Sequence, residues 1–161
     1  MVGLVLVLGL LASAAAHHSP LQQRALDLVL EEFHSRRTVQ AAFKEQSVAE
    51  AMEVEFPMGT FVQLQVHLIQ TFCRKQQRET QNCRIKPGGR KQLCLACFKF
   101  DSNNPANVLD KSLRCLSEQS PIFQEVKRKQ DHDCEAVRAA NEGHYQPGVF
   151  AFSKGLPMAS R

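Results

Sequence analysis

The chain of 161 residues has no tryptophan, a single tyrosine and no Asn-x-Ser/Thr glycosylation site. The Gly-x-Ser-x-Gly, His-Glu-x-x-His and phosphate-binding glycine motifs of common enzymes do not occur either. The six histidines are scattered, and His67 falls on the polar face of its segment, where a solvated side chain is expected. These absences favour a protein that works by binding, with no catalytic residues, bound metal or cofactor.

Long apolar runs are absent after the first sixteen residues. Residues 1–16 carry no charge and lead from an apolar core into small residues that end at Ala16, as in a secretory signal peptide that lacks the usual basic start. A membrane anchor is the weaker interpretation, because crossing a bilayer takes roughly 20 apolar residues. We expect a secreted, extracellular protein without stable membrane insertion, cleaved after Ala16 in preference to Ala14.

The remaining chain contains an even set of cysteines. They are Cys73, Cys83, Cys94, Cys97, Cys115 and Cys134. In an oxidising compartment such a set normally forms three disulfides. The Cys-x-x-Cys at Cys94 and Cys97 also permits a zinc or redox site, but neither a second Cys-x-x-Cys nor a thioredoxin-like strand–helix pattern accompanies it. Structural disulfides are therefore the better prediction.

Positive charge gathers in one segment. Residues 73–99 contain eight basic side chains and one acidic one, a net charge of +7, so the remainder of the +4 chain sums to −3. The candidate polyanion-binding residues are Arg74, Lys75, Arg78, Arg84, Lys86, Arg90 and Lys91. Such a patch attracts heparin-like glycans or anionic membranes, and a merely solvated loop is an equal alternative. Nucleic acid is a poorer partner, since no reading motif is present.

A helix followed by strands is predicted from the apolar spacing. Ser19-Pro20 is a helix-start signal, and apolar residues recur at helical spacing over 21–33, with Glu32 as an exception, before Arg36-Arg37 ends the helix. Strands are predicted over 39–56, over the strictly alternating 62–68 and over 93–100. Turns are predicted at 57–59 and 101–105, and a loop at 74–90. A short helix or strand is predicted over 122–126, and no apolar pattern continues after Cys134.

The strand over 93–100 constrains the disulfides. Cys94 and Cys97 are an odd number of residues apart, so on a strand they point to opposite faces and take separate partners. Cys73 and Cys83 bracket the basic loop and form the obvious local pair. Cys115 and Cys134 are then shared between Cys94 and Cys97, in an order that the spacing leaves open.

This order of elements resembles the cystatin and cathelicidin fold. That fold is α+β, with an N-terminal helix packed on a curved antiparallel sheet. Cystatins inhibit papain-like proteases through a Gln-x-Val-x-Gly hairpin and a Pro-Trp loop. Here the hairpin position reads Glu55-Phe56-Pro57-Met58-Gly59, while Gln46-Ser47-Val48-Ala49-Glu50 imitates the motif upstream without its glycine. Because tryptophan is also missing, cysteine-protease inhibition is not expected.

The C-terminal segment indicates a branch of that fold. Tyr145-Gln146-Pro147-Gly148-Val149-Phe150-Ala151-Phe152-Ser153-Lys154 closely resembles the activation peptide of the chemerin family, with Gln146 and Val149 as departures. The resemblance covers about residues 21–157 and includes Leu30–His34 and Cys94–Cys97. It implies a signal peptide 1–16, a cystatin-like domain 17–143, a receptor-activating segment 144–153 in a flexible tail, and a removable propeptide 154–161. It also implies disulfides Cys73–Cys83, Cys94–Cys115 and Cys97–Cys134.

By this resemblance the protein is a monomeric, secreted chemoattractant and adipokine precursor. The resemblance implies that serine or cysteine proteases remove the residues after Ser153, with Lys154 as a first cleavage site. The new end would then bind G-protein-coupled chemerin receptors. Leukocyte chemotaxis, control of inflammation, adipocyte differentiation and metabolic signalling are the implied outcomes. The implied receptor-binding residues are Tyr145, Pro147, Gly148, Phe150, Ala151, Phe152 and Ser153.

Two further interpretations remain open at this point. Phe150 and Phe152 are two residues apart, so they share one side of an extended tail and suit apolar receptor pockets, but the same spacing is typical of a last strand packed on the core. A cathelicidin-like antimicrobial protein with its activity in residues 62–81 is the alternative function. Only Arg74, Lys75 and Arg78 provide positive charge in that segment.

Overall fold

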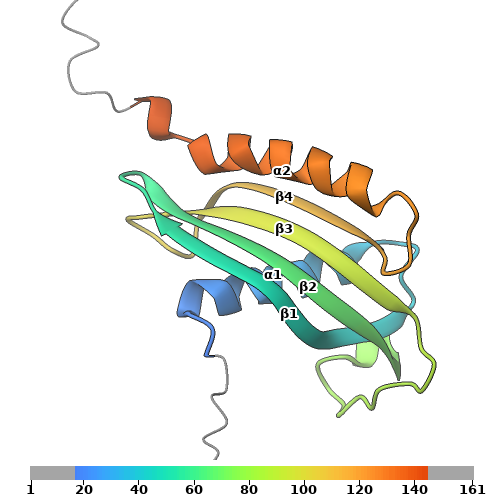
Figure 1. Cartoon of the computed structure of the whole chain (residues 1–161). Coiled ribbons are helices and arrows are strands. Elements are labelled where there is room, and N and C mark those ends of the chain that lie inside the picture. Colours follow the sequence, from blue (N-terminus) through green and yellow to red (C-terminus); the bar gives the residue numbers. More distant parts are fainter. Residues whose placement is uncertain (1–16, 145–161) are drawn as a thin grey trace, which may run out of the picture.

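The computed structural model describes residues 17–144. The predicted signal peptide with its cleavage at Ala16 lies outside these residues, as do the receptor-binding segment from Tyr145 onward and the cleavage sites at Ser153 and Lys154. Between 17 and 144, no helix is both long and apolar enough to span a membrane. The described chain forms one four-stranded antiparallel sheet with a helix on each face (Figure 1).

The predicted N-terminal helix is confirmed as α1, Pro20–Ser35. The Ser19 hydroxyl accepts the Gln22 backbone N–H at 3.1 Å, and the Gln22 side chain accepts the Ser19 N–H in return, a capping box that fixes the first turn. The apolar stripe over 25–33 is buried. Glu32, the exception in that stripe, lies at its border and forms an ion pair with Lys111, so its carboxylate is not left unpartnered.

The strands follow in chain order across the sheet. They are β1 (Ala41–Glu55), β2 (Gly59–Arg74), β3 (Lys91–Asp101) and β4 (Val108–Ser117). The first three confirm the predicted strands, and both predicted turns lie where expected. The predicted loop is also present, although it contains a 3-10 turn over Lys75–Gln77 and a single bridge between Thr71 and Ile85. Strand β4 was not predicted, because most of its residues are half-buried and no strict alternation marks it.

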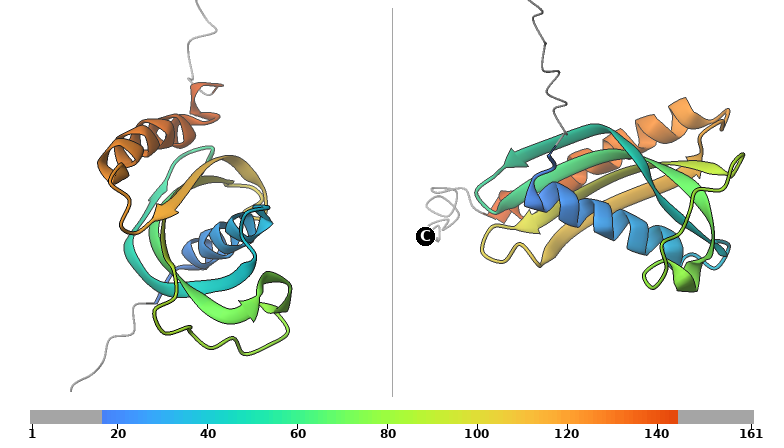
Figure 2. Two further views of the ribbon diagram at one scale, coloured as in Figure 1. Left: turned by 90° about the vertical axis from the view of Figure 1, so that its right-hand side faces the viewer. Right: turned by 90° about the horizontal axis from the view of Figure 1, so that it is seen from below.

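The sheet curves around α1 and carries α2 (Phe123–Ala139) on its other face (Figure 2). The larger core lies between α1 and the sheet and includes Val29, Phe33, Val66 and Phe98. The prediction of only a short element over 122–126 was wrong. Only three residues of α2 are buried, and one of them is a glutamine, so the helix lacks the apolar stripe that would have revealed its length.

Three disulfides brace this arrangement. Their pairs are Cys73–Cys83, Cys94–Cys115 and Cys97–Cys134, which are the pairs that the family resemblance implies. Cys94 belongs to the core beneath α1, whereas Cys97 belongs to a second cluster beneath α2, as the odd spacing on the strand requires. The Cys97–Cys134 bond therefore ties α2 directly to the middle of the sheet.

Candidate functional site

The described chain ends beside the turn between β1 and β2. Helix α2 stops at Ala139, Asn141 takes a left-handed conformation with φ of 63°, and a 3-10 turn over Glu142–His144 follows. Asparagine tolerates this conformation better than most residues, so it suits a helix end. Figure 1 shows this end of α2 and the β1–β2 turn at the same end of the molecule. The predicted receptor-binding residues therefore begin at Tyr145, directly after His144, the last residue that the structure describes.

A fully buried lysine holds that position. Lys99 on β3 has no exposed surface, and its Nζ donates to the carbonyl oxygen of Arg138 at 2.6 Å. The same Nζ lies 2.9 Å from Glu142 Oε1 and 4.3 Å from the centre of the Phe56 ring. A buried ammonium is tolerated only when such partners replace water. Lys99 thus joins the sheet, the β1–β2 turn and the last residues before the C-terminal segment.

The β1–β2 turn completes this arrangement, which we call the root cluster: Phe56, Met58, Lys99, Arg138 and Glu142. Glu142 Oε1 accepts the Met58 backbone N–H at 3.2 Å, and the Arg138 guanidinium lies 5.3 Å from the Phe56 ring centre. Gly59 allows the start of β2 to lie directly against the backbone of β3. A Cβ there would lie 2.3 Å from the Phe100 carbonyl oxygen. Gly59, which matches the inhibitory glycine of cystatins in sequence, therefore has a packing role here.

The turn that corresponds to the inhibitory hairpin of cystatins is therefore in contact with β3 and with the end of α2. Phe56 contacts Lys99 and Arg138, and Met58 is hydrogen-bonded to Glu142. Residues 46–50, the second imitation of the motif, lie within β1 rather than at a turn. At the first position Phe56 and Met58 are held by other parts of the chain, and the second position forms no turn.

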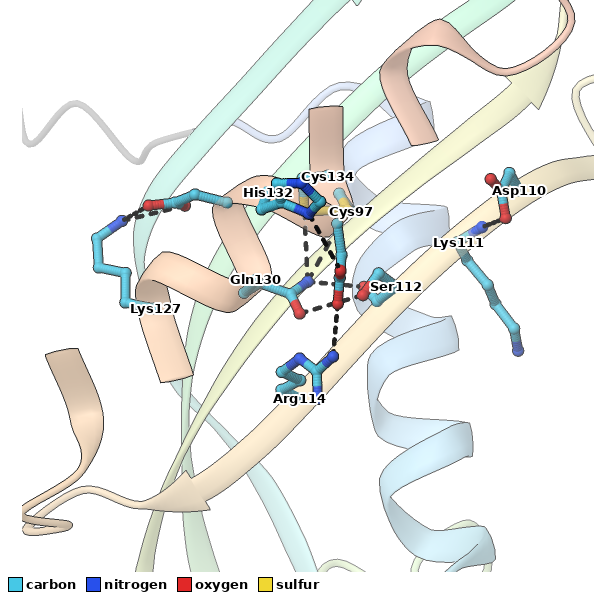
Figure 3. Close-up of a disulfide and its surroundings, with 11 residues drawn as sticks. Cys97, Asp110, Lys111, Ser112, Arg114, Lys127, Gln130, His132 and Cys134 are labelled. Carbon is cyan, nitrogen blue, oxygen red and sulfur yellow. Dashed lines mark hydrogen bonds and ion pairs between the residues drawn. A yellow bond between two sulfur atoms is a disulfide. The ribbon is translucent and has the colours of Figure 1, made fainter. Parts of the chain in front are cut away.

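Polar contacts around the Cys97–Cys134 disulfide hold α2 against the sheet (Figure 3). Gln130 is buried, and its amide nitrogen donates to the Ser112 carbonyl at 3.0 Å while its oxygen accepts the Ser112 hydroxyl at 3.1 Å. Arg114 pairs with Asp133 on the same helix, and its hydrogen bond lowers the pKa of that carboxyl. A disulfide, a buried amide and an ion pair thus prevent α2 from sliding along the sheet.

The basic residues predicted to bind polyanions lie at the other end of the molecule, in and around the β2–β3 loop (Figures 1 and 2). Arg90 donates to the Gln70 side chain at 3.5 Å, and Lys91 lies 3.9 Å from Glu118 Oε2. Lys75 and Arg78 contact the end of α1: Lys75 Nζ donates to the Arg36 carbonyl at 3.2 Å, and Arg78 donates to the Leu30 carbonyl at 3.4 Å. Both are half-buried. The five that remain exposed are Arg74, Arg84, Lys86, Arg90 and Lys91.

A buried histidine links α1 to β1 next to this basic loop. His34 Nδ1 lies 2.6 Å from the Leu30 carbonyl oxygen, and Nε2 accepts the Phe43 backbone N–H at 2.9 Å. These partners require a neutral ring with its proton on Nδ1. Burial lowers the pKa of His34 below its ordinary value, and the positive charges of Arg78 and Lys75 act in the same direction. The sequence alone did not single out this residue.

His67 differs from its prediction. It was expected to be a solvated histidine, but its ring is half-buried and Nδ1 lies 2.8 Å from Glu118 Oε1. The reason is the β4–α2 connection, which brings Glu118 against β2. Within 17–144, no group of histidine, cysteine and acidic side chains has a spacing that could hold a metal ion.

Comparisons with known proteins define the class and then the family. No family model matches the chain. The crystal structure of dimeric human cystatin F aligns with a TM-score of 0.50 and 20% identity, covering 63% of this chain and 82% of that one, so the chain has a cystatin-like fold. The retinoic acid receptor responder protein 2 of Homo sapiens is 40% identical over 162 residues, which cover 99% of this chain and 98% of the relative. The Bos taurus protein of that name is 40% identical over 95% of this chain and 94% of its own length. The chain belongs to the retinoic acid receptor responder protein 2, or chemerin, family.

Proposed function

We propose that this protein is a secreted signalling ligand that is made as a weakly active precursor. Proteolysis after Ser153 removes residues 154–161, and the new end binds a G-protein-coupled chemerin receptor. The observation that carries the proposal is the 40% identity over 99% of the chain, because a match of that extent includes the C-terminal segment as well as the domain. Chemotaxis of leukocytes, control of inflammation and adipocyte differentiation belong to the same proposal.

The described domain supports the role of a rigid carrier. The root cluster and the Cys97–Cys134 disulfide fix the residue from which the C-terminal segment starts. Fixing that point reduces the conformational entropy that the segment loses on binding. The side chains of Phe150 and Phe152 then act as apolar anchors in the receptor, while the residues after Ser153 in the precursor obstruct deep insertion.

Receptor-bearing cells provide the test. Residues 17–153 should signal at a much lower concentration than residues 17–161, and Phe150→Ala or Phe152→Ala in the shorter form should abolish the signal. Phe72→Ala is the matched control, because Phe72 is 63% exposed on the domain and takes no part in the proposal. Equal potency of the two chain lengths would overturn the proposed function.

A second candidate function, binding of heparin-like glycans, is favoured by one observation. Five basic side chains stay exposed around the β2–β3 loop, at the end of the molecule away from the root cluster. A glycan bound there leaves the C-terminal segment accessible, so this function is compatible with the first.

The antimicrobial alternative for residues 62–81 is less well supported. Val62, Leu64, Val66 and Leu68 are buried core residues of β2, so the segment acts as a separate peptide only after the sheet is broken. Failure of the isolated peptide 62–81 to kill bacteria at low salt would dismiss this alternative.

A further inference from the structure

We propose that in the precursor the exposed edge of β1 binds the chain's own C-terminal segment and holds Phe150 and Phe152 away from the receptor. This inference rests on the proposed function, which it extends by naming the surface that keeps the precursor weak. The surface is residues 49–55, which we call the β1 edge.

The β1 edge is unusually open. In the described sheet β1 is an outer strand, so the backbone groups on its far side have no strand beside them. Residues 49–53 are exposed one after another, where a covered strand would alternate, and Met52 is 40% exposed. Such an edge is a template for pairing with a further strand.

The charge of the β1 edge selects among possible occupants. Glu50, Glu53 and Glu55 are exposed, and no basic residue lies between Lys44 and Arg74 in the chain. A second copy of the same edge would bring like charges together, which is destabilising. Residues 145–161, by contrast, contain Lys154 and Arg161 and no acidic side chain. The charge therefore favours the chain's own C-terminal segment.

Position and length also fit. Glu55 is followed by Phe56 of the root cluster, so the C-terminal segment starts beside the end of the β1 edge. A chain that turns back from that point runs antiparallel to β1. Seven residues of strand span about 23 Å, and the ten residues from Tyr145 to Lys154 reach about 33 Å when extended. Val149, Phe150 and Phe152 are residues that favour strands, and the two phenylalanines would share one face of an added strand.

Cleavage would then reverse the electrostatics. Hydrolysis of the Ser153–Lys154 bond adds water, leaving a carboxylate on Ser153 and an amino group on the released peptide. Both basic side chains leave with residues 154–161. The new carboxylate lies on the same segment as the anchors and is repelled by Glu50 and Glu53. Proteolysis thus converts an attraction into a repulsion and frees the two phenylalanines.

Amide hydrogen exchange tests the docking without a receptor. Amides of residues 49–55 should exchange about tenfold more slowly in chain 17–161 than in chain 17–153, the combined effect expected of a few exposed charge pairs. The difference should disappear in E50Q/E53Q/E55Q and persist in E31Q/E125Q/E135Q, which removes the same charge from exposed helical positions. Because Glu53 also accepts the Ser19 hydroxyl, E50Q/E55Q serves as a second variant that leaves this contact intact. Equal exchange in the two parent chains would overturn the inference.

A receptor assay then links docking to activity. The longer chain with E50Q/E53Q/E55Q should signal about tenfold more strongly than its parent, whereas the shorter chain should be unaffected by the substitutions. A longer variant that stays as weak as its parent would contradict the inference. If instead the two parent chains signal equally, the proposed function fails, and the exchange experiment still decides whether the segment docks.

Discussion

Lys99 shows how one buried charge can organise a site. Its side chain is fully buried, and its ammonium contacts the Arg138 carbonyl, Glu142 and the Phe56 ring. The sequence shows a lysine in an otherwise apolar strand, but its partner Arg138 is 39 residues away, and both Phe56 and Glu142 are 43 residues away. This is why the root cluster could not be predicted from local pattern, even though Gly59 and its turn were recognised.

At the same scale, Lys99→Met should loosen the root of the C-terminal segment. Methionine fills the path of the stem but leaves the Glu142 carboxylate without its cation, at a cost of about 3 kcal/mol of unfolding free energy. Urea unfolding measures the loss, and hydrogen exchange at residues 140–144 should accelerate. The control is Lys129→Met on the exposed face of α2, where neither quantity should change. Unchanged exchange in Lys99→Met would show that the lysine does not hold this segment.

The buried His34 predicts a dependence of stability on pH. Because the folded state lowers the pKa of His34 from its ordinary value of 6.5, the unfolded chain takes up the proton first as the pH falls. The stabilisation is therefore complete above about pH 6.5 and declines as the pH drops below it. Urea unfolding at pH 7.5 and 5.5 should show this decline, and His34→Gln should reduce it. An undiminished decline in His34→Gln would refute the assignment.

At the scale of elements, the two helices contrast in what the sequence reveals. Helix α1 has a capping box and a wide apolar stripe, and it was predicted to within two residues of its C-terminal end. Helix α2 buries only Gln130, Cys134 and Val137, because a disulfide and polar contacts replace most of the apolar burial. Periodicity predicts elements that are held by apolar packing and misses those that are held by specific bonds, since only the former leave a repeating pattern.

The attachment of α2 gives a prediction for the Cys97–Cys134 disulfide. C97A/C134A opens a loop of 37 residues, which costs about 4 kcal/mol in the chain-entropy description, whereas C73A/C83A opens a loop of 10 residues and costs about 3 kcal/mol. Only the first variant should also speed hydrogen exchange throughout α2, because the second disulfide lies at the other end of the sheet. Urea unfolding and exchange together check both points. Protection of α2 that survives C97A/C134A would show that its polar contacts suffice.

At the scale of the whole molecule, the basic β2–β3 loop and the last described residues, Glu142–His144, lie at opposite ends. The sequence predicted the basic loop correctly but not that Lys75 and Arg78 are partly used to hold α1. These two contacts depend on where the β2–β3 loop lies against α1, which only the tertiary structure defines. The remaining fold class, a cystatin-like helix and curved sheet with three disulfides, was predicted from patterning and resemblance and is confirmed.

The exposed basic end predicts the behaviour of the protein on immobilised heparin. R84Q/K86Q should elute at a clearly lower sodium chloride concentration than the parent, because both side chains are exposed and salt screens such contacts. R24Q/K129Q removes the same charge from the two helices and should elute close to the parent. Similar shifts for the two variants would indicate that net charge, rather than the basic end, governs retention.

The root cluster also limits which surfaces the β1–β2 turn can contact. The tip of the β1–β2 turn is the part that a cystatin presents to its target, and here Phe56 and Met58 are engaged by the end of α2. Freeing this turn to contact another protein would require breaking the bonds that Glu142 and Lys99 make between the turn, the sheet and the end of α2. The turn can therefore present its residues to a target or stay bonded to the end of α2, but it cannot do both.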